Sequence, residues 1–200
     1  MATYQDSRYN IALPSGAGGA ISLLKTLTAS SSSTLSFVDG SSDVVLDNTY
    51  RTYVFKFISI HPQNDDVNFT FQGTIDSGSN YNVTMTNSYF IANHNEGDTY
   101  AVLNYQTAID QAQGTSFQRI CRIGNDNDQC GSGELWLFNP SSTTYTKHFI
   151  ARMSEAHPSE YIQDSFVAGY FNTTSAIDGV QFKMSGGNID SGTIKLYGIK

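Results

Sequence analysis

The sequence predicts an all-β protein: a jelly-roll-like antiparallel β-sandwich that carries an extended N-terminal arm. Three observations lead to this prediction. Phe and Tyr each occur 12 times in 200 residues, and only 14% of the residues are charged, which suits pleated strands joined by polar turns. Short runs of alternating apolar and polar residues recur along the chain. No window shows an apolar stripe with the period of a helix.

Residues 1–33 differ from the rest of the chain and are predicted to form an arm and a linker. Residues 15–20 are rich in Gly and Ala, and residues 29–33 are mostly Ser. Both compositions are typical of flexible segments. We expect a neighbouring subunit to hold the arm in place beside the sandwich domain of residues 34–200.

Beyond the arm, each predicted strand rests on alternation between turn signals. VNFTFQ (67–72) is the clearest case, because Val67, Phe69 and Phe71 share the inward face, and Asn68, Thr70 and Gln72 share the outward face. ELWLFN (134–139) is apolar on both faces, so we predict a central strand that is covered on both sides. TAIDQAQG (107–114) is predicted to form one helical turn. The predicted strands span 34–38, 53–60, 67–72, 81–86, 88–92, 100–105, 117–123, 134–139, 145–153, 165–171, 180–184 and 193–199.

The charge balance bears on partners and location. The net charge is −7, from 11 Lys and Arg against 18 Asp and Glu. With no basic cluster in the chain, this balance argues against nucleic acid as a partner. The longest apolar runs are too short to span a bilayer, so no membrane partner is expected. MATYQDSRYN lacks the apolar region of a signal peptide, so we expect the cytoplasm of the cell that makes the protein as the place of synthesis.

The only two cysteines, Cys121 and Cys130, bracket the polar run RIGNDNDQ. A calcium loop starting at Asp126 would place a thiol at the fifth position and Leu137 at the twelfth, so two oxygen ligands of an EF-hand are missing. A zinc site would need further Cys or His ligands nearby. We therefore expect no metal and no other cofactor.

A disulfide between Cys121 and Cys130 stays open as an alternative. A hairpin between the flanking strands would bring the two residues close enough to bridge. The cytoplasm keeps thiols reduced, whereas a particle released by lysis meets oxygen. We expect that function does not depend on the bridge.

Motifs of catalysis are missing from the chain. It has no G-x-S-x-G nucleophile elbow and no HExxH zinc motif, and GAGGA (16–20) lacks the lysine of a phosphate-binding loop. We therefore assign no catalytic residues and predict a protein that is not an enzyme. Two carboxylates at a suitable separation would suffice for glycoside hydrolysis, so a glycan-cleaving enzyme stays as an alternative.

The most polar loop of the chain, NHNEGD, is the candidate for an exposed binding surface. Loops carry binding residues more often than strands do. The simpler interpretation is a solvated connection between two strands. The candidate binding residues are Asn93, His94, Asn95, Glu96 and Asp98.

Several stretches carry a resemblance to a known family. They are TYVFKFISIHPQND (52–65), DSGSNYNVT (76–84), LFNPSSTTYTKHFIA (137–151), VAGYFNTTSAIDGVQFKMSGGNIDSGTIKLYGI (167–199) and the N-terminal MATYQDSRYNIALPSGAGG. These stretches resemble a family of small proteins encoded by tailed bacteriophages, including cyanophages and other aquatic phages. Members of that family are regarded as virion structural proteins, and the family supplies no catalytic residues.

The resemblance implies a location in the virion and partners among the other virion proteins, such as the major capsid or tail proteins. We predict a capsid decoration or cement protein that is attached through its N-terminal arm. The alternative is a tail-fibre or receptor-binding module that recognises a host-surface glycan or protein through loops such as 93–99 or 154–164. A closed homo-oligomer, a trimer in particular, would suit either role.

Overall fold

The computed structural model describes residues 20–200, which form thirteen β-strands. The strands are β1 (Ile21–Thr28), β2 (Leu35–Val38), β3 (Thr52–Pro62), β4 (Val67–Thr74), β5 (Met85–Asn95), β6 (Ala101–Tyr105), β7 (Gln111–Gly114), β8 (Gln118–Ile123), β9 (Gly131–Phe138), β10 (Lys147–His157), β11 (Tyr161–Phe171), β12 (Gly179–Met184) and β13 (Ile189–Ile199). Within residues 20–200, no helix is long and apolar enough to cross a membrane.

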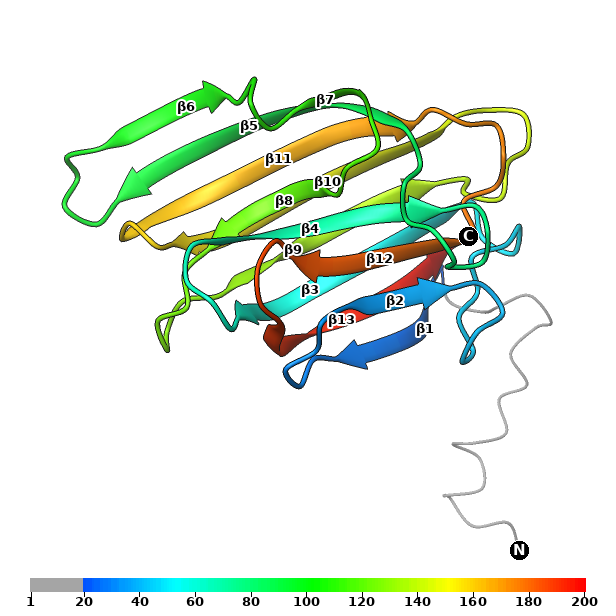
Figure 1. The fold of residues 1–200 in the computed structure, drawn as a ribbon, viewed down its shortest axis with the longest axis horizontal. Helices are drawn as coiled ribbons and strands as arrows, with labels where there is room; N and C mark the ends of the chain where they lie inside the picture. Colours follow the sequence, from blue (N-terminus) through cyan, green and yellow to red (C-terminus); the bar gives the residue numbers. More distant parts are fainter. Residues whose placement is uncertain (1–19) are drawn as a thin grey trace, which may run out of the picture.

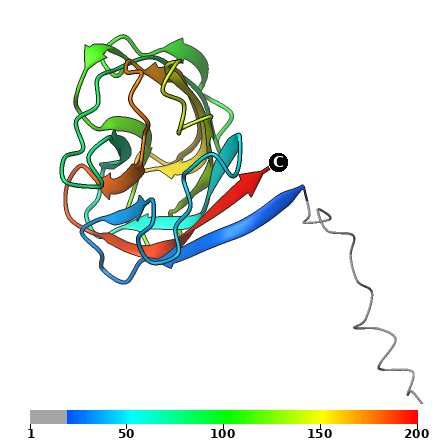
Figure 2. The ribbon, with the colours of Figure 1, turned by 90° about the vertical axis from the view of Figure 1, so that its right-hand side faces the viewer.

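The strands form two antiparallel sheets. The large sheet has nine strands in the order β1-β13-β3-β9-β10-β11-β5-β6, and β7 also pairs with β5. The small sheet has four strands in the order β2-β12-β4-β8. The small sheet lies against one face of the large sheet, which curls around it (Figures 1 and 2). The predicted all-β antiparallel sandwich is therefore confirmed.

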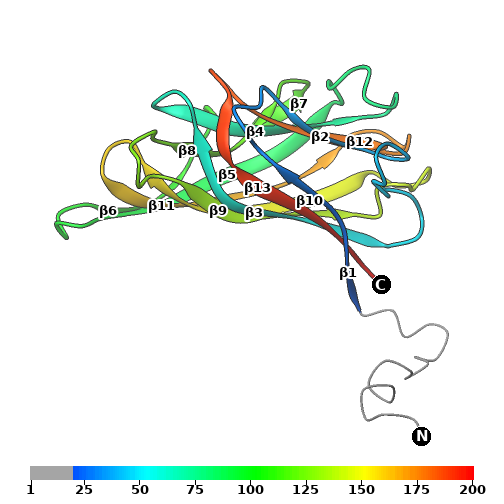
Figure 3. The same ribbon diagram turned by 90° about the horizontal axis from the view of Figure 1, so that it is seen from below.

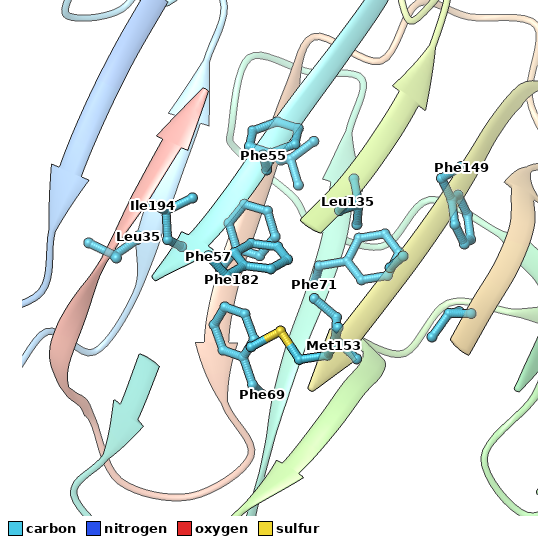
Figure 4. Packing of buried hydrophobic residues seen from close by; sticks show 14 of the residues in the cluster. Leu35, Phe55, Phe57, Phe69, Phe71, Leu135, Phe149, Met153, Phe182 and Ile194 are labelled. Carbon is cyan, nitrogen blue, oxygen red and sulfur yellow. The ribbon is translucent and has the colours of Figure 1, made fainter. Parts of the chain in front are cut away.

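Strand alternation places one face of each strand in the space between the sheets. On β10, Phe149 and Met153 are buried, whereas the residues between them on the outward side are exposed. Phe182 of β12 packs against Phe57 of β3 and Phe69 of β4, with ring centroids 5.2 and 5.8 Å apart. Figure 4 shows these rings interdigitating between the sheets. Each such ring stabilises the fold by about 1.5–3 kcal/mol through burial alone.

The predicted arm and linker of residues 1–33 are wrong in their second half. Ile21–Thr28 forms β1, an edge strand of the large sheet that pairs with the C-terminal strand β13. Ser32 then forms a bridge with Ile189. The sequence did not reveal this strand, because the strand is held by its pairing with β13 at the far end of the chain and not by a local pattern. Residues 1–19, the rest of the predicted arm, lie outside the described residues.

Strand β9 is central in the large sheet, but only one of its faces is covered. Leu135 and Leu137 are buried between the sheets, while Trp136 and Phe138 are half-buried on the outer face. The prediction of cover on both sides is therefore wrong. The Trp136 ring lies against the outer face of the sheet, stacked beside Phe138 with ring centroids 6.5 Å apart. Its indole N–H donates a hydrogen bond to Glu134 Oε1 (2.7 Å).

Two other segments differ from the sequence prediction. The separate strands predicted over 81–86 and 88–92 are replaced by one long strand, β5. The segment 107–114 makes a single turn, in which the N–H of Ile109 donates to the carbonyl of Gln106, and then continues as β7. In both segments, pairing with neighbouring strands decides which residues form a strand, and the local composition does not reveal that pairing.

Candidate functional site

Turns from three parts of the chain meet at one end of the sandwich. They are the β5–β6 turn (96–100), the β10–β11 turn (158–160) and the β8–β9 loop (124–130). Figures 1 and 3 show the β5–β6 and β10–β11 turns at the left, opposite the end that holds the C-terminus and the start of β1. A cleft of about 400 Å³ opens between the turns. We call it the end cleft.

The predicted binding loop supplies part of the end cleft. His94, Asn95 and Glu96 belong to its lining. Asn93 is buried rather than exposed, because its Oδ1 accepts a hydrogen bond from Gln163 Nε2 (2.9 Å) between the sheets. Including Asn93 in the exposed loop is therefore wrong. The cause is the length of β5, which continues to Asn95 and keeps the alternation of inward and outward side chains.

Asn95 shapes the β5–β6 turn. Its Oδ1 accepts hydrogen bonds from the N–H groups of Thr99 and Tyr100, both at 2.9 Å, and its Nδ2 donates to Thr99 Oγ1. Asp98 holds a left-handed backbone (φ 53°) at the turn, and its Oδ1 lies 3.1 Å from His94 Nε2. Because the amide of Asn95 is occupied within the turn and His94 Nε2 lies against Asp98, Glu96 is the residue of this loop that lines the cleft with a side chain unpaired in the described chain.

His157 and Tyr161 lie side by side in the cleft, with ring centroids 4.2 Å apart and ring planes 12° apart. Burial, together with the nearby Arg122 guanidinium, lowers the pKa of His157 to about 4, so the imidazole is neutral near pH 7. The N–H of Ser159 donates to His157 Nδ1 (3.1 Å). A neutral imidazole that accepts at Nδ1 carries its proton on Nε2.

The position of that proton sets the role of the Tyr161 hydroxyl. His157 Nε2 lies 3.1 Å from the Tyr161 hydroxyl oxygen. Because Nε2 carries the proton, it has no lone pair with which to accept a hydrogen bond from that hydroxyl. As a result, the hydroxyl hydrogen of Tyr161 is free to donate to a ligand in the cleft.

Three carboxylates also line the end cleft, those of Glu96, Asp128 and Glu160. Glu160 Oε1 accepts a long hydrogen bond from Gln129 Nε2 (3.4 Å). The side chains of Glu96 and Asp128 are exposed, and no other group of residues 20–200 donates a hydrogen bond to them. The lining contains no Lys or Arg from the described chain. The cleft is therefore a concave surface of negative charge.

The polar loop that resembles a calcium site lies beside this cleft. Asp126 and Asp128 are exposed in the β8–β9 loop. In the part of the chain that the structure describes, no three His, Cys, Asp or Glu side chains are grouped so that they could hold a metal ion. The carboxylates are spaced around the cleft instead of converging on one point.

Both cysteines have free thiols. The hairpin that was expected to bring them together is not formed. Cys121 lies in β8, which pairs with β4 in the small sheet. Cys130 precedes β9, which pairs with β3 and β10 in the large sheet. Burial between the sheets raises the pKa of the Cys121 thiol, which keeps it protonated and unreactive.

The outer face of the large sheet carries a second candidate surface. Cross-strand pairing aligns five residues from five neighbouring strands, which we call the apolar row: Leu23, Tyr197, Val54, Trp136 and Ile150. Leu23 is 54% exposed, and Ile150 is 50% exposed. A shallow hollow of about 290 Å³ lies among Val54, Trp136 and Tyr197, with Ile21 at its side.

A charged row separates the apolar row from the end cleft. Lys195, Lys56, Glu134 and Arg152 follow one another across the sheet. Lys56 pairs with Glu134, and Arg152 pairs with Asp164, so these charges are balanced within the surface. Exposed pairs of this kind add little stability. Along β10, the apolar row and the end cleft are six residues apart, or about 20 Å.

Comparison of the chain with protein-family models, with curated proteins and with solved structures finds no match. The two surfaces are therefore interpreted from their own chemistry. Sequence reasoning included His157 and Tyr161 only as members of the candidate binding loop 154–164 and did not single them out, although the run HPSEY combines a turn signal with two aromatic rings. It also missed the apolar row, which exists only once the register of five strands is known.

Proposed function

We propose that this protein is a non-enzymatic structural component of a phage virion that decorates and cements the capsid. The observation that carries the proposal is the apolar row on the outer face of the large sheet. Leu23 and Ile150 at its ends are exposed, Trp136 and Tyr197 are half-buried, and Val54 between them is buried. Exposed apolar patches mark surfaces that bind other proteins. The row begins on β1, beside the point where the N-terminal segment joins the sandwich. Attachment through the N-terminal segment and this face together suits the resemblance to phage structural proteins.

The polar groups between the sheets support a non-enzymatic role. Ser165 Oγ donates to Glu155 Oε1 at 2.6 Å, a contact that could activate a hydroxyl in an open site. Both side chains are buried between the sheets, with Ser165 0% and Glu155 1% exposed. A substrate has no access to them, so we interpret the pair as structural.

The test compares virions with and without the protein. A cement protein binds the assembled shell and therefore stabilises it against heat. We expect stripped particles to release DNA at a lower temperature than intact ones, and added full-chain protein to restore the difference. Ile150→Glu should abolish rebinding, whereas Tyr145→Glu, which alters an exposed tyrosine in the loop between β9 and β10, should rebind normally. Identical melting of stripped and intact particles would contradict the proposal.

The proposal includes a closed homo-oligomer, with a trimer as the expected form. β1 and β6 are the two edge strands of the large sheet. Edge strands offer unpaired backbone groups to other chains. Sedimentation of the purified full chain over a range of concentrations measures the assembly state. A monomer at every concentration would contradict this part of the proposal.

A second candidate function is a receptor-binding module. The observation that favours it is the meeting of the loops 93–99 and 154–164 at one cleft. This cleft lies at the far end from β1, so a chain attached at the β1 end would present it to solvent. The purified protein should then adsorb to host cells and compete with the phage. Failure to adsorb would exclude this function.

A further inference from the structure

The end cleft combines hydrogen-bond donors, acceptors and apolar surface in one hollow. Tyr161 has a free hydroxyl hydrogen, because the protonated Nε2 of His157 beside it cannot accept a hydrogen bond. Glu96 and Asp128 offer carboxylate oxygens to a ligand. Ile162 is 47% exposed and adds an aliphatic surface. The volume of about 400 Å³ falls within the usual range of small-molecule sites, about 300–1,000 Å³.

The pairing of donor and acceptors decides which ligand class fits. An ammonium or guanidinium group only donates hydrogen bonds, so it would leave the Tyr161 hydroxyl hydrogen without an acceptor. A hydroxyl group both donates and accepts, and a sugar ring presents several hydroxyls beside an apolar C–H face. A lone metal ion fits poorly, because within residues 20–200 no group of ligands converges.

We propose that the end cleft binds a neutral saccharide. The carboxylates of Glu96, Asp128 and Glu160 accept hydrogen bonds from its hydroxyl groups. The Tyr161 hydroxyl donates to a further oxygen, and Ile162 contacts the apolar face of the ring. With three carboxylates and no lysine or arginine in the lining, the cleft repels sugars that carry carboxylate, sulfate or phosphate. This inference gives a ligand class to the receptor-binding module, the second candidate function. The biological role of saccharide binding rests on that proposed function.

Calorimetric titration of the full chain with three sets of probes tests the proposal. The neutral set contains oligomers of glucose, galactose, mannose and N-acetylglucosamine. The acidic set contains sialyllactose and oligogalacturonate, and the cationic set contains spermidine and tetralysine. We expect at least one neutral saccharide to bind more tightly than the cationic probes, which only the negative charge of the cleft attracts, and we expect no binding of the acidic probes.

Variants locate the binding. Tyr161→Phe keeps the ring and its stack but removes the donor, so we expect binding to weaken about 2- to 10-fold, the effect of one hydrogen bond. Glu96→Gln, at an exposed position, should weaken binding without affecting the fold. Tyr145→Phe alters a tyrosine that is 70% exposed and lies outside the cleft, and it should bind like the wild type.

Three results would overturn the proposal. They are no binding of any neutral saccharide, binding of the cationic probes alone, and neutral binding that Tyr161→Phe and Glu96→Gln both leave unchanged. Adsorption to host cells without saccharide binding would end this inference and keep the receptor-binding function. Saccharide binding without adsorption would support the inference and exclude that function.

Discussion

The space between the two sheets has two halves of opposite character. In the half around β12, aromatic rings fill the space, and Phe182 contacts Phe37, Phe55, Phe57 and Phe69 with centroids 5.2 to 6.2 Å apart. In the half between β8 and the strands β5, β10 and β11, polar side chains are buried. The polar half contains Tyr89, Asn93, Arg119, Glu155, Gln163 and Ser165.

The polar half is hydrogen-bonded but not fully satisfied. Tyr89 donates to Ser165 Oγ (3.0 Å), Ser165 donates to Glu155 Oε1, and Arg119 donates to Gln163 Oε1 (3.2 Å). In the described chain, Glu155 Oε2 and Arg119 Nε have no partner. From Glu155, β10 runs directly into the end cleft. The aromatic half around β12 therefore supplies stability, whereas the polar half supports the end cleft and makes the free energy of unfolding depend on pH.

The largest change in the free energy of unfolding is expected from a substitution in the aromatic half. Phe182→Ala removes a ring that contacts four other rings, and we expect a loss of about 3–5 kcal/mol in the free energy of unfolding. Urea unfolding at pH 7 measures it. The control Tyr145→Ala, at an exposed position, should change stability by less than about 0.5 kcal/mol. A comparable loss in both variants would mean that the aromatic half is not the main source of stability.

The next effect belongs to the polar half. Burial raises the pKa of the Glu155 carboxyl well above 4.5. The folded state therefore keeps a proton that the unfolded chain releases, and stability falls as the pH rises from 4.5 through the raised pKa. Glu155→Gln should flatten this decline and be more stable than the wild type at pH 8 by about 1–3 kcal/mol. Denaturant unfolding between pH 4 and 9 measures both slopes, and equal slopes would refute the assignment.

The two halves also differ in how well the sequence predicts them. Alternation in VNFTFQ correctly places Val67, Phe69 and Phe71 in the core, because the period of a strand is a local property. Placing Thr70 and Gln72 on an exposed face is wrong, because both are buried and Gln72 donates to the carbonyls of residues 115 and 116. The sequence did not predict which strands share a sheet. The pairing of β1 with β13 and the crossover from β8 to β9 depend on partners that local composition does not reveal. For the same reason, the apolar row could not be foreseen.

The candidate site shows the same limit. The polar composition of residues 93–98 singled out a loop of which three residues line the end cleft, and the binding role of that loop stays a prediction. Tyr161 joins that loop only because β11 pairs with β5, which places Tyr161 opposite Asn95. His157 is neutral because it is buried, a property that the sequence alone does not show. Loop chemistry is thus visible in the sequence, whereas the juxtaposition of two loops is not.

The third effect is the contribution of His157, in the end cleft, to the pH dependence of stability. It differs in sign from the contribution of Glu155 in the polar half. The pKa of His157 falls from 6.5 to about 4 on folding, chiefly through burial. Its contribution to stability is complete above pH 6.5 and is lost as the pH falls toward 4, because only the unfolded chain takes up the proton. Glu155 acts in the opposite direction above pH 4.5, so the measurement belongs in the Glu155→Gln background. There, His157→Gln should flatten the acid decline by about 1–2 kcal/mol, and an unchanged decline would contradict this origin.

The smallest change in stability is expected in the β10–β11 turn. It distinguishes a turn residue that serves stability from one that serves the end cleft. Glu160 has a left-handed backbone (φ 60°), which costs a residue other than glycine about 1–2 kcal/mol, partly offset by the greater freedom of glycine in the unfolded chain. Glu160→Gly should therefore raise stability by about 0.5–1 kcal/mol. Asp98→Gly, the matched change at φ 53° on the facing turn, should gain less, because aspartate tolerates this conformation better.

If Glu160 serves the end cleft, the more stable Glu160→Gly variant should bind neutral saccharide more weakly than the wild type. Thermal unfolding and calorimetric titration of the same samples measure the two quantities together. A gain in stability with unchanged binding would assign Glu160 to the turn alone. A gain that is accompanied by weaker binding would mean that the chain keeps a strained residue there for its carboxylate, as the polar half of the core keeps Glu155 at a cost in stability.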